Sequence, residues 1–379
     1  MPVNQVLGQV LSQFSIMPEL NTVYSCLFSN KGAEFFCTPH DSSDDVNSLI
    51  SDYLDTHTTS IPLTITDTKT GPQAFFIAEK EDEYHRLADR TGGDGYKVQI
   101  NKDFWIEQKN IVILGHNSKC DDIMVGFDAF RREWNPADGS EILNIMVIDD
   151  KKSLERHNYY RGYPYVTHVI EAELSDVEVI TAAINMFVDS NTEDTSVLIL
   201  SDDTVPDEDI DSNALTYLIY IQDIIFERLR IQPGFRRESI DIVVEIINPK
   251  NYDVVHNYSV NNVVISNRYI SKMVTQISRK DALFDFYQDI LTYDDEGSDG
   301  YESKELYVKK VSSLFDELPP PCTAAQLIRA VFDATPDFNK SIVLGYASVE
   351  GDLVLFEGDQ NDIRVELKPT DKLIVFSNH

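Results

Sequence analysis

The stretch NIVILGHNSKCDDIMVGFDAF (residues 110–130) decides the fold, because it joins a short apolar strand to a helix through a tight turn. Within residues 110–115, a continuous apolar run (111–114) ends at a glycine, which is typical of a parallel strand covered on both faces. A helix is predicted over residues 121–134. A strand that leads through a glycine turn into a helix is the opening unit of a doubly wound sheet.

The same alternation continues along the chain. Further strands are predicted at 142–149, 165–172, 196–201, 240–246 and 262–266, and further helices at 176–189, 213–230 and 249–258. Strands linked by crossover helices predict an α/β fold, namely a Rossmann-like doubly wound parallel sheet.

Two flanking segments have a different order of elements. Residues 305–377 predict a strand, a helix near 324–334 and then short strands, which is a small α+β lobe, and residues 30–80 show a similar order. The predicted domains are linking helices at 1–28, a first α+β lobe at 29–91, the Rossmann-like domain at 92–266, crossover and linking helices at 267–292, and a second α+β lobe at 293–379.

The two flanks look like copies of one unit. An ungapped alignment of residues 13–28 with residues 276–291 pairs Gln13 with Gln276 and Tyr24 with Tyr287. Two amphipathic helices can match by chance, but the similar order of the elements that follow favours duplication. The chain then reads as the end of one unit followed by a whole second unit, which predicts that the protein continues upstream of Met1.

Composition limits the partners. The 379 residues include 64 acidic and 32 basic side chains, a formal charge of −32. This balance argues against nucleic acid and against direct binding to anionic lipid, because both need a basic surface. No stretch approaches the roughly 18 apolar residues of a membrane helix. The four cysteines form no CxxC pair and fit a reducing compartment, so a cytoplasmic location is expected.

The chain resembles RCK regulators of potassium channels, and in particular the Castor/Pollux type. The resemblance is carried by the stretch 110–130, by SVLILSDD (196–203), by DIVVEIINPKN (241–251) and by DILTYDDEGSDGYESKELYV (289–308). It implies a cytosolic gating-ring module of a cation or potassium channel. The partners it implies are other copies of the chain, joined through helices around residues 266–291, and the pore domain of the same channel.

Two other functions are compatible with the fold. One is an NAD(P)-linked oxidoreductase, and the other is a free-standing regulator that docks onto a separate membrane subunit. No GxSxG, HExxH or P-loop motif occurs, so we do not expect an enzyme. His116 beside Cys120 suggests a base and a nucleophile, but neither has a visible orienting partner, so a histidine in a surface turn is the favoured interpretation.

The turn after residue 114 is a degenerate nucleotide site. A dinucleotide fingerprint reads G-x-G-x-x-G, whereas this frame has Gly115, Asn117 and Cys120. Asp149 ends the second strand, where a ribose-binding acid belongs. The two aspartates that open the helix at 121 would repel a phosphate. Binding of a nucleotide is therefore not expected.

Two acidic segments are candidates for Ca²⁺, which prefers hard oxygen ligands. The segment 201–211 contains Asp202, Asp203 and Asp207, and the segment 293–302 contains Asp294, Asp295 and Glu296. The second segment fails the register of an EF-hand loop. A solvated loop is the alternative for the first segment, and no cofactor is assigned with certainty.

Overall fold

The computed structural model describes residues 3–29, 32–40, 45–88, 95–101, 107–134, 140–150, 154–191, 194–206, 208–256, 262–291, 304–348 and 352–377. Contacts divide the chain into two units, Met1–Asn21 with Ile106–Ile270 and Thr22–Trp105 with Ser271–His379. Within the described ranges, no helix combines the length and the apolar character needed to cross a bilayer.

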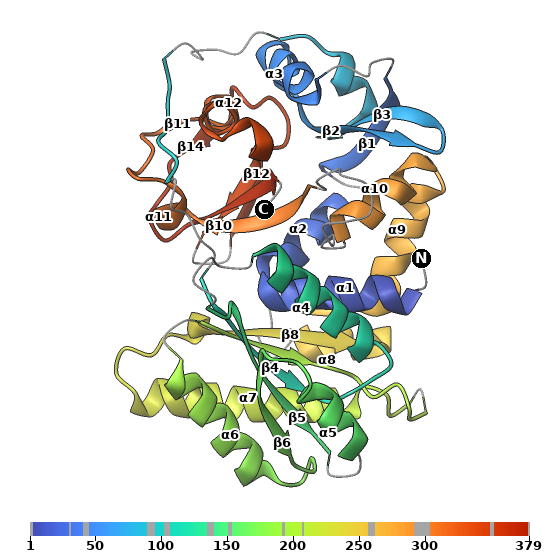
Figure 1. The fold of residues 1–379 in the computed structure, drawn as a ribbon, viewed down its shortest axis with the longest axis vertical. Coiled ribbons are helices and arrows are strands. Elements are labelled where there is room, and N and C mark those ends of the chain that lie inside the picture. Colours follow the sequence, from blue (N-terminus) through green and yellow to red (C-terminus); the bar gives the residue numbers. More distant parts are fainter. Residues whose placement is uncertain are drawn as a thin grey trace. The chain divides into compact units, whose positions relative to one another are not determined.

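A six-stranded parallel sheet forms the core of the first unit, and four of its strands are labelled in Figure 1. The strand order is β6-β5-β4-β7-β8-β9. The strands are β4 (Lys109–Leu114), β5 (Leu143–Asp149), β6 (Val166–Glu171), β7 (Thr195–Ile199), β8 (Ile240–Ile246) and β9 (Asn262–Ile265). This order is that of a Rossmann sheet and confirms the predicted fold class. The direction of winding reverses between β4 and β7, and ligands of such sheets bind outside the carboxyl ends of the strands at that point.

Helices cover the sheet because its strands are apolar on both faces. They are α4 (Cys120–Glu133), α5 (Leu154–Tyr160), α6 (Val177–Ser190), α7 (Ser212–Ile231) and α8 (Tyr252–His256), with 3₁₀ turns η2 (Arg237–Ser239) and η3 (Pro249–Asn251). Helices α6 and α7 bury apolar side chains such as Ile184 and Leu218 against Val112 and Met146 of the sheet. The short helix α5 has no counterpart among the predicted elements.

The helix α1 (Val3–Ile16) packs against α4 in the same unit, although the two are far apart in the sequence. Glycines make the approach close. A Cβ at Gly8 would lie 2.4 Å from Cβ of Asp122, and one at Gly126 would lie 2.1 Å from Oγ of Ser12. The backbones of α1 and α4 therefore meet where neither can carry a larger side chain.

The second unit contains the two small α+β lobes. The first lobe has the antiparallel order β1-β3-β2 and the second has β10-β15-β12-β13. The bounds of the first lobe are β1 (Glu34–Pro39), α3 (Val46–Thr56), β2 (Ser60–Thr68), β3 (Gly71–Ala78) and η1 (Glu81–His85). Those of the second are β10 (Glu305–Lys310), α11 (Val311–Leu314), β11 (Cys322–Thr323), α12 (Ala324–Ala334), η4 (Asp337–Asn339), β12 (Ile342–Ala347), β13 (Leu353–Leu355), β14 (Arg364–Val365) and β15 (Lys372–Ser377).

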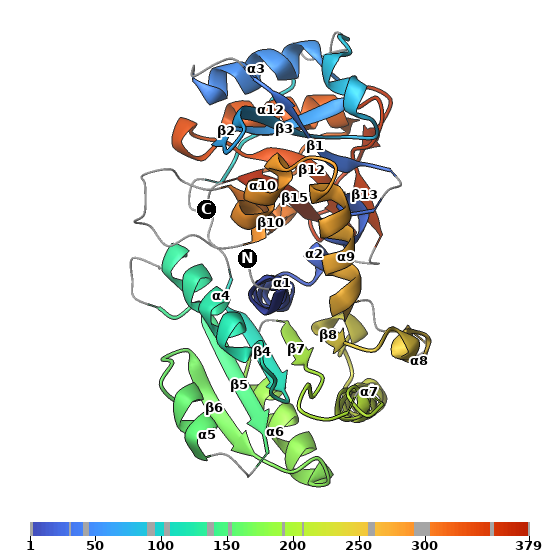
Figure 2. The same cartoon turned by 90° about the vertical axis from the view of Figure 1, so that its right-hand side faces the viewer.

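The predicted helix pairs are α1 with α2 (Glu19–Leu27), and α9 (Ser266–Ile277) with α10 (Ala282–Leu291) (Figure 2). Within the second unit, Tyr24 on α2 donates a hydrogen bond of 3.0 Å to the carbonyl of Ile290 on α10. Phe28 and Tyr287 pack edge to face, with ring centroids 5.1 Å apart. Aromatic packing thus joins the end of α2 to α10. The five-part division predicted from the sequence stays a prediction.

A lysine with a buried ammonium weakens the second unit. The ammonium of Lys304 has no hydrogen-bond partner among the described residues, and burial lowers its pKa to about 8. Below pH 8 this lysine is charged in both the folded and the unfolded chain, so the folded state bears the full cost of desolvation. Between pH 8 and the unfolded pKa near 10.4, the unfolded chain binds more protons, so stability due to this group rises with pH.

We expect Lys304→Met to raise the free energy of unfolding at pH 7 by on the order of 1–2 kcal/mol. The difference should shrink as the pH rises from 8 to 10, because the wild-type lysine then loses its charge. Urea denaturation at several pH values measures it, and Lys97→Met, at an exposed lysine of the same unit, is the control. A gain that does not change with pH would show that desolvation is not the cause.

Candidate functional site

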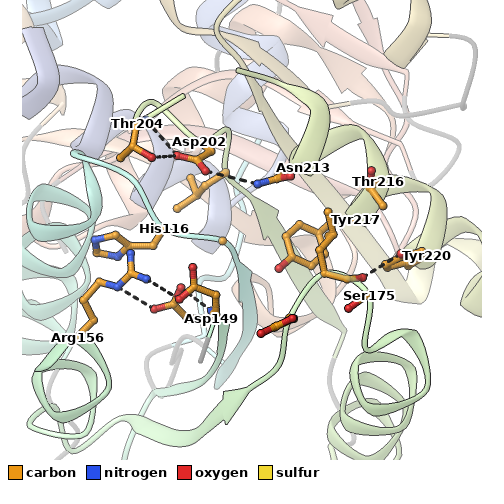
Figure 3. A pocket seen from close by; sticks show the side chains of 15 residues that line it. His116, Asp149, Arg156, Ser175, Asp202, Thr204, Asn213, Thr216, Tyr217 and Tyr220 are labelled. Atoms are coloured by element: carbon orange, nitrogen blue, oxygen red, sulfur yellow. Dashed lines mark hydrogen bonds and ion pairs between the residues drawn. The ribbon is translucent and has the colours of Figure 1, made fainter. Parts of the chain in front are cut away.

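A cleft of about 610 Å³ lies at the carboxyl ends of the central strands of the parallel sheet (Figure 3). Its lining comes from the carboxyl ends of four strands and the loops that follow them, from Arg156 on α5 and from one face of α7. The residues are Gly115, His116, Asp149, Asp150, Arg156, Glu173, Leu174, Ser175, Leu200, Asp202, Thr204, Asn213, Thr216, Tyr217 and Tyr220. This is the place where a doubly wound sheet binds ligands.

Two of the three residues predicted for the nucleotide turn line this cleft, namely Gly115 and Asp149. Gly115 has φ of 90°, and a Cβ there would lie 3.1 Å from the carbonyl oxygen of Leu200, so the turn needs glycine. Asp149 is buried and accepts a hydrogen bond from the amide of Asp150. Its other oxygen lies 3.2 Å from Nε of Arg156. The guanidinium thus balances the acid at the ribose position.

Asn117, the third predicted residue, does not line the cleft. Its side-chain amide donates to Oε2 of Glu245 at 2.7 Å and to the carbonyl of Ser201 at 3.0 Å. Glu245 is 0% exposed and also accepts from Ser266 at 2.6 Å. Nζ of Lys119, itself 4% exposed, lies 3.2 Å from Oε1 of Glu245. Asn117 therefore belongs to a buried polar network below the start of α4.

His116 and Cys120 are not arranged as a base and a nucleophile. Burial, with a contribution from the Arg156 guanidinium, lowers the pKa of His116, and its Nδ1 is 2.7 Å from the Tyr160 hydroxyl. Burial raises the pKa of the Cys120 thiol to about 11. A thiolate is the reactive form of cysteine, so this thiol is inert at neutral pH.

The acidic residues proposed for Ca²⁺ do not converge in the described part of the chain. Asp202 accepts from the amide of Thr204 at 3.0 Å and lines the cleft. Asp203 instead accepts from the amide of Ser118. Asp207 and the trio Asp294, Asp295 and Glu296 lie outside the described residues. Among the residues that are described, no group of three or more metal-ligating side chains is placed to hold a metal ion.

The cleft carries a negative field. Four carboxylates line it, those of Asp149, Asp150, Glu173 and Asp202. The guanidinium of Arg156 supplies positive charge to the same lining. The negative charge also affects the pKa of Tyr217 in the lining. Burial raises this pKa to about 12, and the charges of Asp149 and Asp150 add to the rise. The cleft offers hydrogen bonds, aromatic surface and negative charge, which are means of binding a ligand.

Comparison with known proteins gives structural likeness only. No family model and no curated protein matches the chain. Among solved structures, it is similar to the "GsuK RCK domain" (TM-score 0.31, 12% identity, 99% of this chain and 67% of that one). It is also similar to the "GsuK Channel" (TM-score 0.32, 12% identity, 99% of this chain and 56% of that one). A third similar structure is the "GsuK channel bound to NAD" (TM-score 0.30, 10% identity, 99% of this chain and 56% of that one). The chain thus spans little more than half of the two channel chains, and the fold class rests on its own strand order.

Proposed function

We propose that this chain is a cytosolic regulatory module of a cation or potassium channel, one that binds a ligand without converting it and passes the change to a pore. The observation that carries the proposal is the occurrence, in one domain, of a polar cleft at the reversal of the sheet and of uncovered apolar side chains on α6 and α7. The cleft supplies the sensor, and the uncovered helices supply a surface for assembly.

The cleft is suited to binding rather than to turnover. Among the described residues that line it, the guanidinium of Arg156 is held by Asp149 and Asp150. His116 has a lowered pKa, and the thiol next to it is buried. A general acid and base pair needs a proton donor and an acceptor that both face the ligand, so the engaged guanidinium and the buried thiol support binding without turnover. The absence of turnover is therefore part of the proposal.

The outer faces of α6 and α7 support assembly. Phe226 on α7 is 65% exposed, and Ile219 and Leu229 of the same helix are also exposed. Helix α6 adds Val179 and Met186. The two helices are neighbours, because Arg228 of α7 donates to Oδ1 of Asn185 on α6 at 2.8 Å. Exposed apolar side chains on two neighbouring helices support an interface between proteins here.

The helix α9 offers a second surface, the one predicted from the sequence. Continuing the register of the repeat places Ser271 and Thr275 of α9 opposite Gly8 and Ser12 of α1. The two residues of α1 contact α4, whereas those of α9 are exposed. Val274, between them, is 54% exposed. We propose that this face contacts another copy of the chain, because the resemblance to RCK regulators implies assembly through the helices around residues 266–291.

Assembly is tested by light scattering across a range of protein concentrations. We expect the chain to self-associate, and Phe226→Glu to weaken association at least about tenfold, because a charge would be buried in an apolar contact. Leu154→Glu, at an exposed leucine on α5, is the matched control. Val274→Glu in the same assay reports on α9. A chain that stays monomeric at its highest soluble concentration would contradict assembly through α6 and α7.

Calcium stays a candidate ligand for the acidic segments 201–211 and 293–302. In the first segment, Asp202 and Asp203 are engaged by donors of the chain itself, so a site there would need both to turn. Calorimetry with calcium chloride tests whether the chain binds Ca²⁺. Electrophysiology of the full channel tests whether the chain is coupled to a pore.

A further inference from the structure

The start of α4 is where a Rossmann domain usually holds a phosphate. The free amides of the glycine turn and of the first helical turn point at the ligand, and the helix dipole favours its negative charge. In this chain α4 begins at Cys120, and the amides of the turn that leads into it belong to residues 117–119. Their partners therefore decide whether a phosphate can bind there.

All three amides already have partners within the chain. The amide of Asn117 donates to Sγ of Cys120 at 3.3 Å, and the amide of Lys119 donates to Oδ1 of Asn117 at 3.0 Å. The amide of Ser118 donates to the two carboxylate oxygens of Asp203, at 3.1 and 3.3 Å. The hydroxyl of Ser118 donates to the same carboxylate.

The carboxylate of Asp203 also has a cation beside it. Nζ of Lys119 lies 3.8 Å from Oδ2 of Asp203. An anion held by a backbone amide, a hydroxyl and a lysine at a helix start is a phosphate arrangement in which a carboxylate takes the place of the ligand. The neighbours of this residue in the loop, Asp202 and Thr204, line the cleft. Ser118, Lys119 and Asp203 are not among the residues that line the cleft, so the anion position lies beside it, adjoining its lining residues in the sequence.

We infer that Asp203 is the residue that excludes phosphorylated ligands from the cleft, because the chain uses its carboxylate to fill the anion position. A phosphate that enters here has to displace the Asp203 carboxylate from the amide and the hydroxyl of Ser118. It then lies beside the negative charge of the displaced carboxylate. This inference rests on the proposed role of the cleft as a sensor and specifies it: the cleft takes ligands without a phosphate at this turn.

The test is calorimetric titration with inorganic pyrophosphate and with ADP. Wild-type protein should show no saturable binding of either anion. Asp203→Ala frees the amide and hydroxyl of Ser118 from the carboxylate, while Lys119 keeps Glu245 at 3.2 Å, so we expect it to bind pyrophosphate at least about tenfold more tightly than wild type. Asp202→Ala, which removes an equal charge from the same loop but leaves Ser118 covered, should gain less than about twofold.

Three outcomes would overturn the inference: wild-type protein that binds either anion saturably, equal gains in the two variants, or a folded Asp203→Ala protein without a gain. If Asp203→Ala does not fold, Asp203→Asn, which keeps an acceptor for the Ser118 amide, is compared with Asp202→Asn in the same titration. A larger gain at position 203 supports the inference, and equal affinities overturn it. The titrations do not depend on assembly of the chain. Failure of the inference about Asp203 can therefore be distinguished from failure of the proposed regulatory function.

Discussion

Replacing Glu245 by leucine is expected to lower the free energy of unfolding of the parallel-sheet domain by about 3–5 kcal/mol. Glu245 is fully buried at the carboxyl end of β8, and Lys119 opposite it is also buried. Removing the carboxylate leaves a buried ammonium whose remaining carboxylate contact is Asp203, at 3.8 Å. The Asn117 amide and the Ser266 hydroxyl lose an acceptor as well. An uncompensated buried charge is one of the most costly single defects in a protein.

The double variant Lys119→Met/Glu245→Leu separates charge from packing. Because it removes both members of the pair, we expect it to recover at least half of the stability that Glu245→Leu alone loses. Urea denaturation of the two single variants and the double variant gives the coupling energy. If the double variant is no more stable than Glu245→Leu, the loss comes from the hydrogen bonds of Asn117 and Ser266 and not from the stranded lysine.

The parallel sheet was predictable because its signal is local. Each strand is a short apolar run bounded by turn residues, and covering by helices on both faces gives that pattern directly. The helix α12 begins and ends at the predicted residues, because an N-cap threonine and a capping box mark its start. In contrast, α5 is seven residues long and reads LERHNYY, which has too little apolar periodicity to predict a helix.

The candidate site was predictable only in part. Gly115 and Asp149 line the cleft because their positions at the ends of β4 and β5 are fixed by the fold, and their role in binding stays a prediction. Asn117 was placed in the nucleotide turn by its spacing, but spacing does not say on which side of the turn a side chain lies. The contact between Ser118 and Asp203 joins residues 85 positions apart, and nothing local in either segment indicates it. The closure of the anion position is therefore a property of the fold and not of a motif.

Replacing Gly126 by alanine is expected to detach α1 from the sheet domain, with a loss of about 1–3 kcal/mol in the free energy of unfolding. The added Cβ would lie 2.1 Å from Oγ and 2.9 Å from Cβ of Ser12. Rotation of the hydroxyl removes only the first clash. The second forces the helices apart, so hydrogen exchange of residues 6–16 should speed up in this variant.

The sign of this effect should reverse in a Ser12→Gly background. Once the serine side chain is absent, the nearest remaining atom to the new Cβ is Cα of Gln9, at 3.9 Å, which is ordinary contact. Alanine is favoured over glycine inside a helix by about 1 kcal/mol, so Gly126→Ala should then stabilise the domain by up to that amount. If Gly126→Ala destabilises the domain equally in both backgrounds, the closeness of α1 and α4 is not what requires glycine at this position.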